Sequence, residues 1–300
     1  MEIRKARIRQ LAIDFVLCLI VGLPYLAVWL LVDPFKRGFF CNDDSIKYPY
    51  REDTVSMGAC AGGGIAVALI SFACVEFGVR YGAISDSFRS ILWQSSKIAV
   101  TFFVGAGLTL INIEVGKLTI GRPRPHFIYV CQPDFTKIDC SAGYIDDFTC
   151  QNTHNFSEKT LHEARKSFPS GHSGFSSYTA VFLSVYFFYR LRFGFSFLLS
   201  ITLQLFVIVS AFYIMLSRIS DYKHHWSDVL VGGAIGCFVA VWTIVCLGRH
   251  LSLRRVRHHT QGYDESCTQM EVEQVMASLP RDSAHDGPLS VKGAVSDCIP

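Results

Sequence analysis

Three short polar clusters stand out in a chain that is otherwise strongly apolar. They are KLTIGRPRPHF (117–127), SFPSGHSG (167–174) and SRISDYKHHWSDVL (217–230). Their Lys and Arg side chains can bind anions, and their His side chains can act as acid, base or nucleophile. Side chains of these types, brought together in one site, would suit an anionic substrate.

The second cluster has the pattern of a helix start. Ser170 is a candidate N-cap, and Gly171 lets a ligand approach the backbone closely. Free N–H groups at a helix N-terminus bind anions, which would place His172 beside a bound anion. Taken alone, these residues also fit an ordinary capped helix with a surface histidine. The first cluster, taken alone, fits a basic cap that anchors a helix end.

The third cluster pairs an imidazole with a carboxylate. His224 and Asp228 are four residues apart, so they share one face if the segment is helical. Asp228 would then accept the Nδ1 proton of His224 and present Nε2 outward. The same spacing, helped by His225, also fits a metal site. Because Arg218 and the cations of the first cluster would repel a metal ion, we favour an oriented imidazole beside an anion.

The composition is that of an integral membrane protein. Of the 300 residues, 50% are hydrophobic and 18% are charged, and the mean hydropathy is +0.31, whereas ordinary globular proteins are roughly 25% charged. The net charge of +3 indicates no nucleic-acid partner. A membrane helix needs about 20 mostly apolar residues. Six segments are candidates, the fourth if its helix begins near Gly171: Leu11–Val32, Met57–Val79, Ile98–Gly116, Gly174–Tyr189, Phe195–Leu216 and Val229–Gly248.

These segments predict an all-α integral membrane fold, with six transmembrane helices in one bundle over residues 1–250. The basic stretch MEIRKARIR before the first helix resembles the start of a signal peptide. The apolar stretch that follows is longer than such a peptide needs and has no small-residue cleavage site, so we expect the helix to be retained. Residues 251–300 are polar and lack periodicity, which predicts a disordered cytoplasmic tail.

Lys and Arg residues fall on alternate connections of the six-helix plan, as expected for cytoplasmic loops. This pattern places both termini in the cytoplasm and all three polar clusters on the outer side. Three unrelated helix caps would not need two histidines, a serine and several cations on one side of a membrane. The clusters therefore predict one active site at the extracytoplasmic face.

The outer loops carry two signs of an extracytoplasmic location. Asn155-Phe156-Ser157 is a glycosylation sequon. Four cysteines lie in these loops, where the compartment is oxidising: Cys41, Cys131, Cys140 and Cys150. One or two disulfides are expected, with the connectivity open. A zinc site is the less favoured alternative, because the chain has no CxxC pair.

Two further features concern the helices themselves. The stretch Gly58–Ala68 and the pair Gly232 and Gly236 place small residues at helix-contact spacing, which predicts close packing of membrane helices. Glu76 lies near a helix end, where we expect an interfacial charge.

The clusters together resemble the signature of the type 2 phosphatidic acid phosphatase superfamily, which is K-x6-R-P, then P-S-G-H, then S-R-x5-H-x3-D. Every position of this signature is matched, by Lys117 with Arg124-Pro125, by Pro169-Ser170-Gly171-His172, and by Ser217-Arg218 with His224 and Asp228. The phrases FFCNDDSIKYPY and SRISDYKHHWSDVL resemble the animal lipid phosphate phosphatase branch in particular.

The resemblance implies a membrane hydrolase that removes phosphate from lipid monoesters without a metal or other cofactor. The implied substrates are phosphatidate, lysophosphatidate, ceramide 1-phosphate and sphingosine 1-phosphate, which links the activity to lipid metabolism and signalling. The implied roles are phosphate binding by Lys117, Arg124, Ser170, Gly171 and Arg218, nucleophilic attack by His224, orientation of His224 by Asp228, and protonation of the leaving oxygen by His172. These roles agree with phosphoryl-transfer chemistry, which depends on positioning and on stabilising charge on the phosphate oxygens.

Three alternatives stay open. The chain could act on another phosphate, such as a sugar phosphate or an isoprenoid diphosphate, or transfer phosphate between lipids. It could also bind lipid phosphates or partner proteins without catalysis, although the intact His172, His224 and Asp228 argue against this. We expect a multi-pass protein of the plasma membrane, with the bilayer and lipid phosphates as its partners. Internal membranes and a homo-oligomer stay open, because lumen and exterior are topologically equivalent and the sequence does not determine the oligomeric state.

Overall fold

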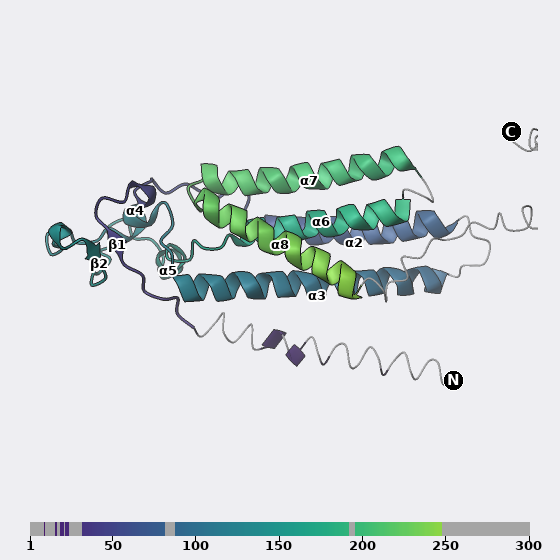
Figure 1. Ribbon diagram of the computed structural model, residues 1–300, viewed down its shortest axis with the longest axis horizontal. Helices are drawn as coiled ribbons and strands as arrows, with labels where there is room; N and C mark the ends of the chain where they lie inside the picture. Colours follow the sequence, from purple (N-terminus) through teal and green to yellow (C-terminus); the bar gives the residue numbers. More distant parts are fainter. Residues whose placement is uncertain are drawn as a thin grey trace, which may run out of the picture. The chain divides into compact units, whose positions relative to one another are not determined.

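The computed structural model describes residues 32–81, 88–191 and 196–247, with a few isolated positions before residue 32. Within these ranges the chain forms a bundle of long helices, with loops, short helices and a small sheet gathered at one end (Figure 1). Most of the predicted first span (11–32) and the whole predicted tail (251–300) lie outside the described residues.

Each of the other five predicted spans is helical over nearly all of its described residues. The long helices are α2 (Met57–Tyr81), α3 (Phe88–Ile120), α6 (Gly171–Leu191), α7 (Phe197–Ser220) and α8 (Trp226–Leu247). Four of them, α2, α3, α7 and α8, are long and apolar enough to cross a membrane. The helix α6 begins at Gly171 as expected, but its first half is rich in serine, and it is not one of these four. The described residues thus support four of the six predicted spans.

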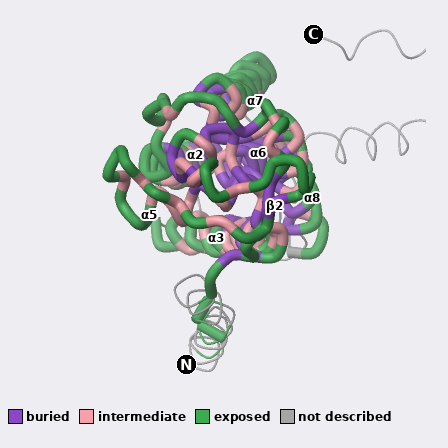
Figure 2. Tube along the Cα trace, turned by 90° about the vertical axis from the view of Figure 1, so that its left-hand side faces the viewer, coloured by how far each residue is buried: buried purple, intermediate pink, exposed green. Residues whose placement is uncertain are grey.

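The helix α6 lies at the centre of the bundle and packs against the other four long helices (Figures 1 and 2). Its contact with α8 depends on small residues: a Cβ atom at Gly232 or Gly236 would collide with the backbone of Ser170 or Gly174. This confirms the predicted close packing at these two glycines. By contrast, α7 exposes large apolar side chains such as Phe206 on its outer surface, as a helix facing lipid should.

The carboxylate of Glu76 is buried between helices, so the expectation of an interfacial charge is wrong. Glu76 is fully buried, and its Oε1 accepts hydrogen bonds from Arg190 Nε at 2.7 Å and from the Tyr186 hydroxyl at 3.2 Å. Arg190 Nη2 also pairs with Oε2. A charge near the end of α2 therefore finds its partner near the end of α6, which removes the need for contact with water.

The end of the bundle at which α6 begins is covered by a small cap with an apolar core of its own, which includes Phe39, Phe127 and Val130. The cap contains the 3₁₀ helices η1 (Asp44–Ile46) and η2 (Cys140–Ala142) and the short helices α4 (Phe127–Cys131) and α5 (Glu158–Glu163). Strands β1 (Phe39–Phe40) and β2 (Tyr144–Ile145) pair antiparallel, with Phe39 opposite Ile145.

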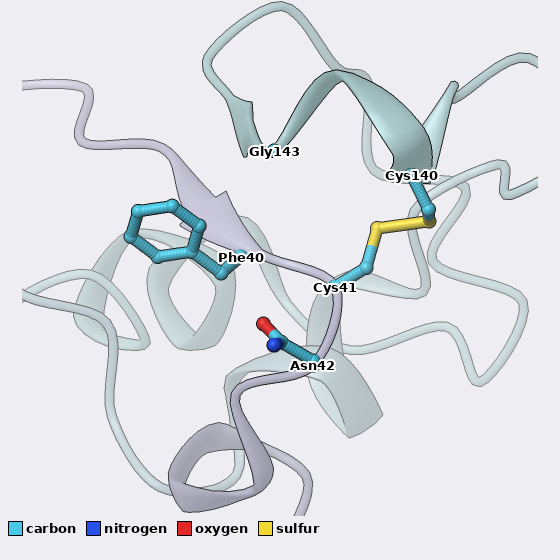
Figure 3. A pocket seen from close by; sticks show the side chains of 5 residues that line it. All are labelled: Phe40, Cys41, Asn42, Cys140 and Gly143. Atoms are coloured by element: carbon cyan, nitrogen blue, oxygen red, sulfur yellow. A yellow bond between two sulfur atoms is a disulfide. The ribbon is translucent and has the colours of Figure 1, made fainter.

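Two disulfides close the cap, and they settle the connectivity that the sequence left open. Cys41 bonds to Cys140, and Cys131 bonds to Cys150. Figure 3 shows the first disulfide beside a pocket that is also lined by Phe40, Asn42 and Gly143. The prediction of disulfides is confirmed, and all four cysteines are used in them rather than in a zinc site.

Candidate active site

The three polar clusters meet where the cap joins the bundle. Ser170 N–H donates to the Asp228 carbonyl at 3.0 Å, and Ser167 N–H donates to the Arg122 carbonyl at 2.9 Å. Arg122 Nη1 in turn lies 2.6 Å from Asp228 Oδ1. Each cluster thus bonds directly to the other two, although about 40 to 100 residues separate them along the chain.

The first cluster begins at the end of α3. Lys117 lies in the last turn, with Nζ 3.4 Å from Glu114 Oε2, and a Cβ atom at Gly171 would lie 3.7 Å from the same Nζ. Gly121 ends the helix with a φ of +57°, a conformation that favours glycine. A Cβ atom there would also collide with the Phe35 carbonyl.

Arg124 lies beyond the end of α3 and contacts a carboxylate of the cap. Its Nη2 lies 2.8 Å from Glu163 Oε2. Its Nε is buried and, among the described residues, has no hydrogen-bond partner. A buried guanidinium N–H without a partner is costly, so this group is available to an anion that enters the site.

The second cluster begins α6 as predicted. Ser170 is buried, and its Oγ accepts a hydrogen bond from Ser173 N–H at 3.4 Å, as an N-cap does. His172 lies in the first turn, with Nε2 3.1 Å from the Val55 carbonyl. Because a carbonyl only accepts hydrogen bonds, Nε2 carries a proton in this arrangement, and Nδ1 is the nitrogen left for proton exchange.

The third cluster places Arg218 in the last turn of α7, where it is fully buried. Arg218 Nη1 lies 2.8 Å from Asp53 Oδ1, and Nη2 lies 2.8 Å from Asp221 Oδ2. Thr54 donates to the same Asp221 carboxylate through its N–H and its hydroxyl. The loop before α2 therefore contacts both Arg218 and its partner.

His224 has a different hydrogen-bond partner from the one predicted. Its Nδ1 lies 2.6 Å from the carbonyl oxygen of Ser167 and so donates to it. The helix α8 begins only at Trp226, so His224 and Asp228 do not share a helix face. The predicted direct bond between them is wrong, because the Asp228 carboxylate is taken up by other groups. These are Arg122, the Ser167 hydroxyl at 2.5 Å, and the backbone N–H and Nδ1 of His225 at 3.0 and 3.1 Å.

The surroundings of His224 favour its neutral form. Burial lowers the pKa of the imidazole well below its usual 6.5, and the positive charges of Arg124 and Lys117 lower it further, as does His172. Because Nδ1 holds the proton, Nε2 carries the lone pair at neutral pH. A neutral imidazole with a defined tautomer, close to several cations, is suited to attack an anionic centre.

The structure thus brings every predicted site residue to the same end of the bundle. It also adds four residues that contact them and that were not predicted. Ser167 and Arg122 lie inside the clusters, so their position was a usable signal. Asp53 and Glu163 lie outside the clusters, and no pattern in the sequence marks them as partners of Arg218 and Arg124.

Comparison with known proteins assigns the family. The sequence pattern of the PAP2 superfamily matches residues 98–251, which contain all three clusters. The chain belongs to the PAP2 superfamily. It is 40% identical to phospholipid phosphatase 1 of Rattus norvegicus over 80% of this chain and 86% of that protein. It is 40% identical to phospholipid phosphatase 2 of Homo sapiens over 81% of this chain and 84% of that protein. No solved structure matches the chain.

The PAP2 match does not include the whole of the site. It begins at Ile98 in α3, so α2 and the loop before it lie outside the matched residues. Asp53 and Val55 belong to that loop, yet they contact Arg218 and His172. The PAP2 motif residues are thus partly enclosed by a segment that the match does not cover.

Proposed function

We propose that this protein hydrolyses the phosphate monoesters of lipids, through a phosphohistidine on His224 and without a metal ion. The observation that carries the proposal is the setting of His224, which is buried and has Nδ1 bonded to the Ser167 carbonyl. Burial and the charges of Arg124 and Lys117 lower its pKa, which favours the neutral ring. The relatives are phospholipid phosphatases, which supports phospholipids as the substrate class. Phosphatidate, lysophosphatidate, ceramide 1-phosphate and sphingosine 1-phosphate are the substrates we expect.

Cationic side chains and the first turn of α6 would bind the phosphate group. Lys117, Arg124 and Arg218 would hold the phosphate oxygens, as Arg and Lys commonly do. The first N–H groups of α6, next to Ser170 and Gly171, would add hydrogen bonds and the positive end of the helix dipole. These groups stabilise the charge that spreads over the oxygens in the transition state.

The first chemical step is attack of His224 Nε2 on phosphorus. The bond between phosphorus and the lipid oxygen breaks, and its electron pair leaves on that oxygen. His172 donates a proton to this oxygen, so that an alcohol departs rather than an alkoxide. In the free protein, burial and the charge of Arg218 lower the pKa of His172 to about 4. The negative charge of a bound phosphate would raise this pKa and so favour the protonated form that this step requires.

The second step frees the enzyme. A water molecule gives up a proton to His172 and attacks the phosphorus of the phosphohistidine, the bond between Nε2 and phosphorus breaks, and inorganic phosphate leaves. His224 and His172 return to their starting states. In both steps, the Ser167 carbonyl would keep the proton on Nδ1 of His224.

We also propose that the site faces the cell exterior or a lumen, with the plasma membrane as the main location. The Lys and Arg distribution and the two disulfides of the cap support this orientation. Asn155 is exposed and is the proposed glycosylation site. Asn155→Gln should increase the electrophoretic mobility of the protein from cells, and glycosidase treatment should abolish the difference. Protease accessibility that placed Asn155 in the cytosol would reverse the orientation.

Phosphate release by the purified protein tests the activity. We expect release from phosphatidate and lysophosphatidate in detergent micelles, and much less from a sugar phosphate or an isoprenoid diphosphate. Activity should persist in a strong chelator, because the groups assigned to the substrate are cations and imidazoles, which do not need a metal to bind phosphate. Loss of activity in chelator with rescue by magnesium would contradict the metal-free mechanism. Binding of lipid phosphates without any release would identify a binding protein instead.

A further inference from the structure

Ser167 is a fully buried residue that connects the three clusters. Its N–H donates to the Arg122 carbonyl at 2.9 Å, its hydroxyl donates to Asp228 Oδ2 at 2.5 Å, and its carbonyl accepts from His224 Nδ1 at 2.6 Å. One residue thus bonds to a carboxylate through its side chain and to the proposed nucleophile through its backbone.

Asp228 reaches His224 through this residue. The two residues share no hydrogen bond within the described part of the chain, whereas each of them bonds to Ser167. Arg122 and His225 fix the rest of the carboxylate, so Asp228 is held in place from several sides. A bond of 2.5 Å from a hydroxyl to such a carboxylate is short and charge-assisted, and it restrains the position of Ser167.

We propose that Ser167 is the positioning residue for His224, and that the Asp228 carboxylate orients the imidazole ring through the Ser167 hydroxyl. The inference rests on the proposed function and adds to it a residue that is not part of the PAP2 motif. The Ser167 carbonyl keeps the proton on Nδ1 and the lone pair on Nε2, and the bond from Ser167 to Asp228 keeps that carbonyl in place.

A neutral carbonyl beside Nδ1 differs chemically from a carboxylate. A carboxylate in that position would stabilise the imidazolium and raise the pKa of His224, so that a protonated ring would compete with the nucleophilic form. A carbonyl defines the tautomer without adding a full negative charge. The arrangement through Ser167 therefore orients the ring and leaves it neutral.

A double-mutant cycle separates this arrangement from direct action of Asp228. Ser167→Ala, Asp228→Asn and the double variant are compared with wild type in rapid-quench measurements of phosphoenzyme formation from a lipid phosphate. We expect each single variant to be slower by about 10-fold to 100-fold, as is typical when the group that orients a ligand histidine is lost. The double variant should be no slower than the slower single variant, because both changes break the same connection.

Two further measurements separate positioning from folding. The inhibition constant of inorganic phosphate should stay within about twofold of wild type in Ser167→Ala, because the cations that bind phosphate are unchanged. Ser167→Thr, which keeps the hydroxyl, should recover part of the rate. Ser200→Ala is the matched control: Ser200 is also buried and donates to the Phe187 carbonyl at 3.1 Å, near the opposite ends of α6 and α7. It should leave phosphoenzyme formation unchanged.

Several outcomes would overturn the inference. One is a double variant whose loss equals the product of the two single losses, since Asp228 would then act independently of Ser167. Another is a Ser167→Ala protein that forms phosphoenzyme at the wild-type rate. If Ser167→Ala does not elute as a single species in detergent, Ser167→Cys takes its place, because a thiol is a weaker donor of similar size, and the same two outcomes apply. A wild-type protein that forms no phosphohistidine would instead contradict the proposed function.

Discussion

Arg218 Nη1 donates a hydrogen bond of 2.8 Å to Asp53 Oδ1, so that a carboxylate from the loop before α2 occupies one edge of a guanidinium proposed to bind phosphate. The Arg218 side chain is fully buried, whereas that of Asp53 is 41% exposed. Asp53 also lies 3.9 Å from Lys223 Nζ. If Arg218 binds phosphate as proposed, the Asp53 carboxylate competes with a phosphate oxygen for this edge of the guanidinium.

Asp53→Asn should strengthen binding of inorganic phosphate. Removing the negative charge weakens the competition for Arg218, so the inhibition constant of phosphate should fall several-fold, up to about tenfold, which corresponds to about 1.4 kcal/mol. The effect should be largest at low ionic strength, where charges are screened least.

Asp44→Asn serves as the charge-matched control for this change. Asp44 also lies in the segment before α2, but it pairs with Lys47 on an exposed surface. An equal fall in the inhibition constant for both variants would attribute the effect to net charge rather than to Arg218. An unchanged constant in Asp53→Asn would show that the carboxylate does not compete with phosphate.

His224→Ala should abolish both turnover and the acid-labile phosphoenzyme, because Nε2 is the proposed nucleophile. Rapid-quench trapping of the labelled protein measures this directly. If His224→Ala still forms phosphohistidine and His172→Ala does not, then His172 is the nucleophile and His224 is the general acid. A wild-type protein that is never labelled on histidine would favour direct attack by water.

His172→Ala should slow the reaction most for substrates with a poor leaving group. A general acid contributes about 10²–10⁴-fold when an alkoxide must leave, whereas an activated phenolate leaves without a proton. Phosphoenzyme formation from a lipid phosphate should therefore fall by that factor, and formation from an aryl phosphate should change little. An equal loss for both substrate types would indicate that His172 acts in binding.

The pH dependence should reflect the lowered pKa of His224. Burial, followed by Arg124 and Lys117, lowers this pKa well below 6.5. The protonated ring cannot attack, so activity is lost only as the pH falls through the lowered value. The acidic limb of kcat/KM for phosphoenzyme formation should thus lie below pH 6.5. The same fall in kcat/KM could come from ionisation of the substrate phosphate. Measuring two substrates whose phosphates have different pKa values separates the two causes, because only a fall due to the enzyme stays at the same pH.

Glu76→Ala should destabilise the bundle, because it leaves the Arg190 guanidinium buried beside α2 without its carboxylate. Removing one partner of a buried ion pair costs about 3–5 kcal/mol. Thermal unfolding in detergent measures the loss. Glu158→Ala, at an exposed position of α5, should leave the transition unchanged. Replacing both Glu76 and Arg190 by Leu should recover part of the loss, and a failure to recover any would assign the effect to packing.

Much of this molecule could be predicted from local features of the chain. Apolar runs of membrane length predicted the bodies of α2, α3, α7 and α8, because a bilayer requires about 20 apolar residues per helix. Ser170 capped α6 as expected, since an N-cap bond spans only three residues. The order and spacing of the three clusters predicted the family, and the PAP2 match confirmed it.

Other features depended on how distant segments pack. The spacing of His224 and Asp228 suggested a direct hydrogen bond. Because α8 begins only at Trp226, the two residues do not share a helix face, and the imidazole bonds to the Ser167 carbonyl instead. The pairing of Cys41 with Cys140 spans 99 residues, and no spacing rule selects it.

The sequence by itself determined which side chains could carry chemistry, because charge, nucleophilicity and hydrophobicity belong to the side chains. Only the tertiary structure decided what those residues contact. Asp53 reaches Arg218 across 165 positions of the chain, and Glu76 reaches Arg190 across 114. The physical reason is that a buried charge takes whichever partner the packing of the helices brings within hydrogen-bond distance, and a linear pattern does not contain that distance.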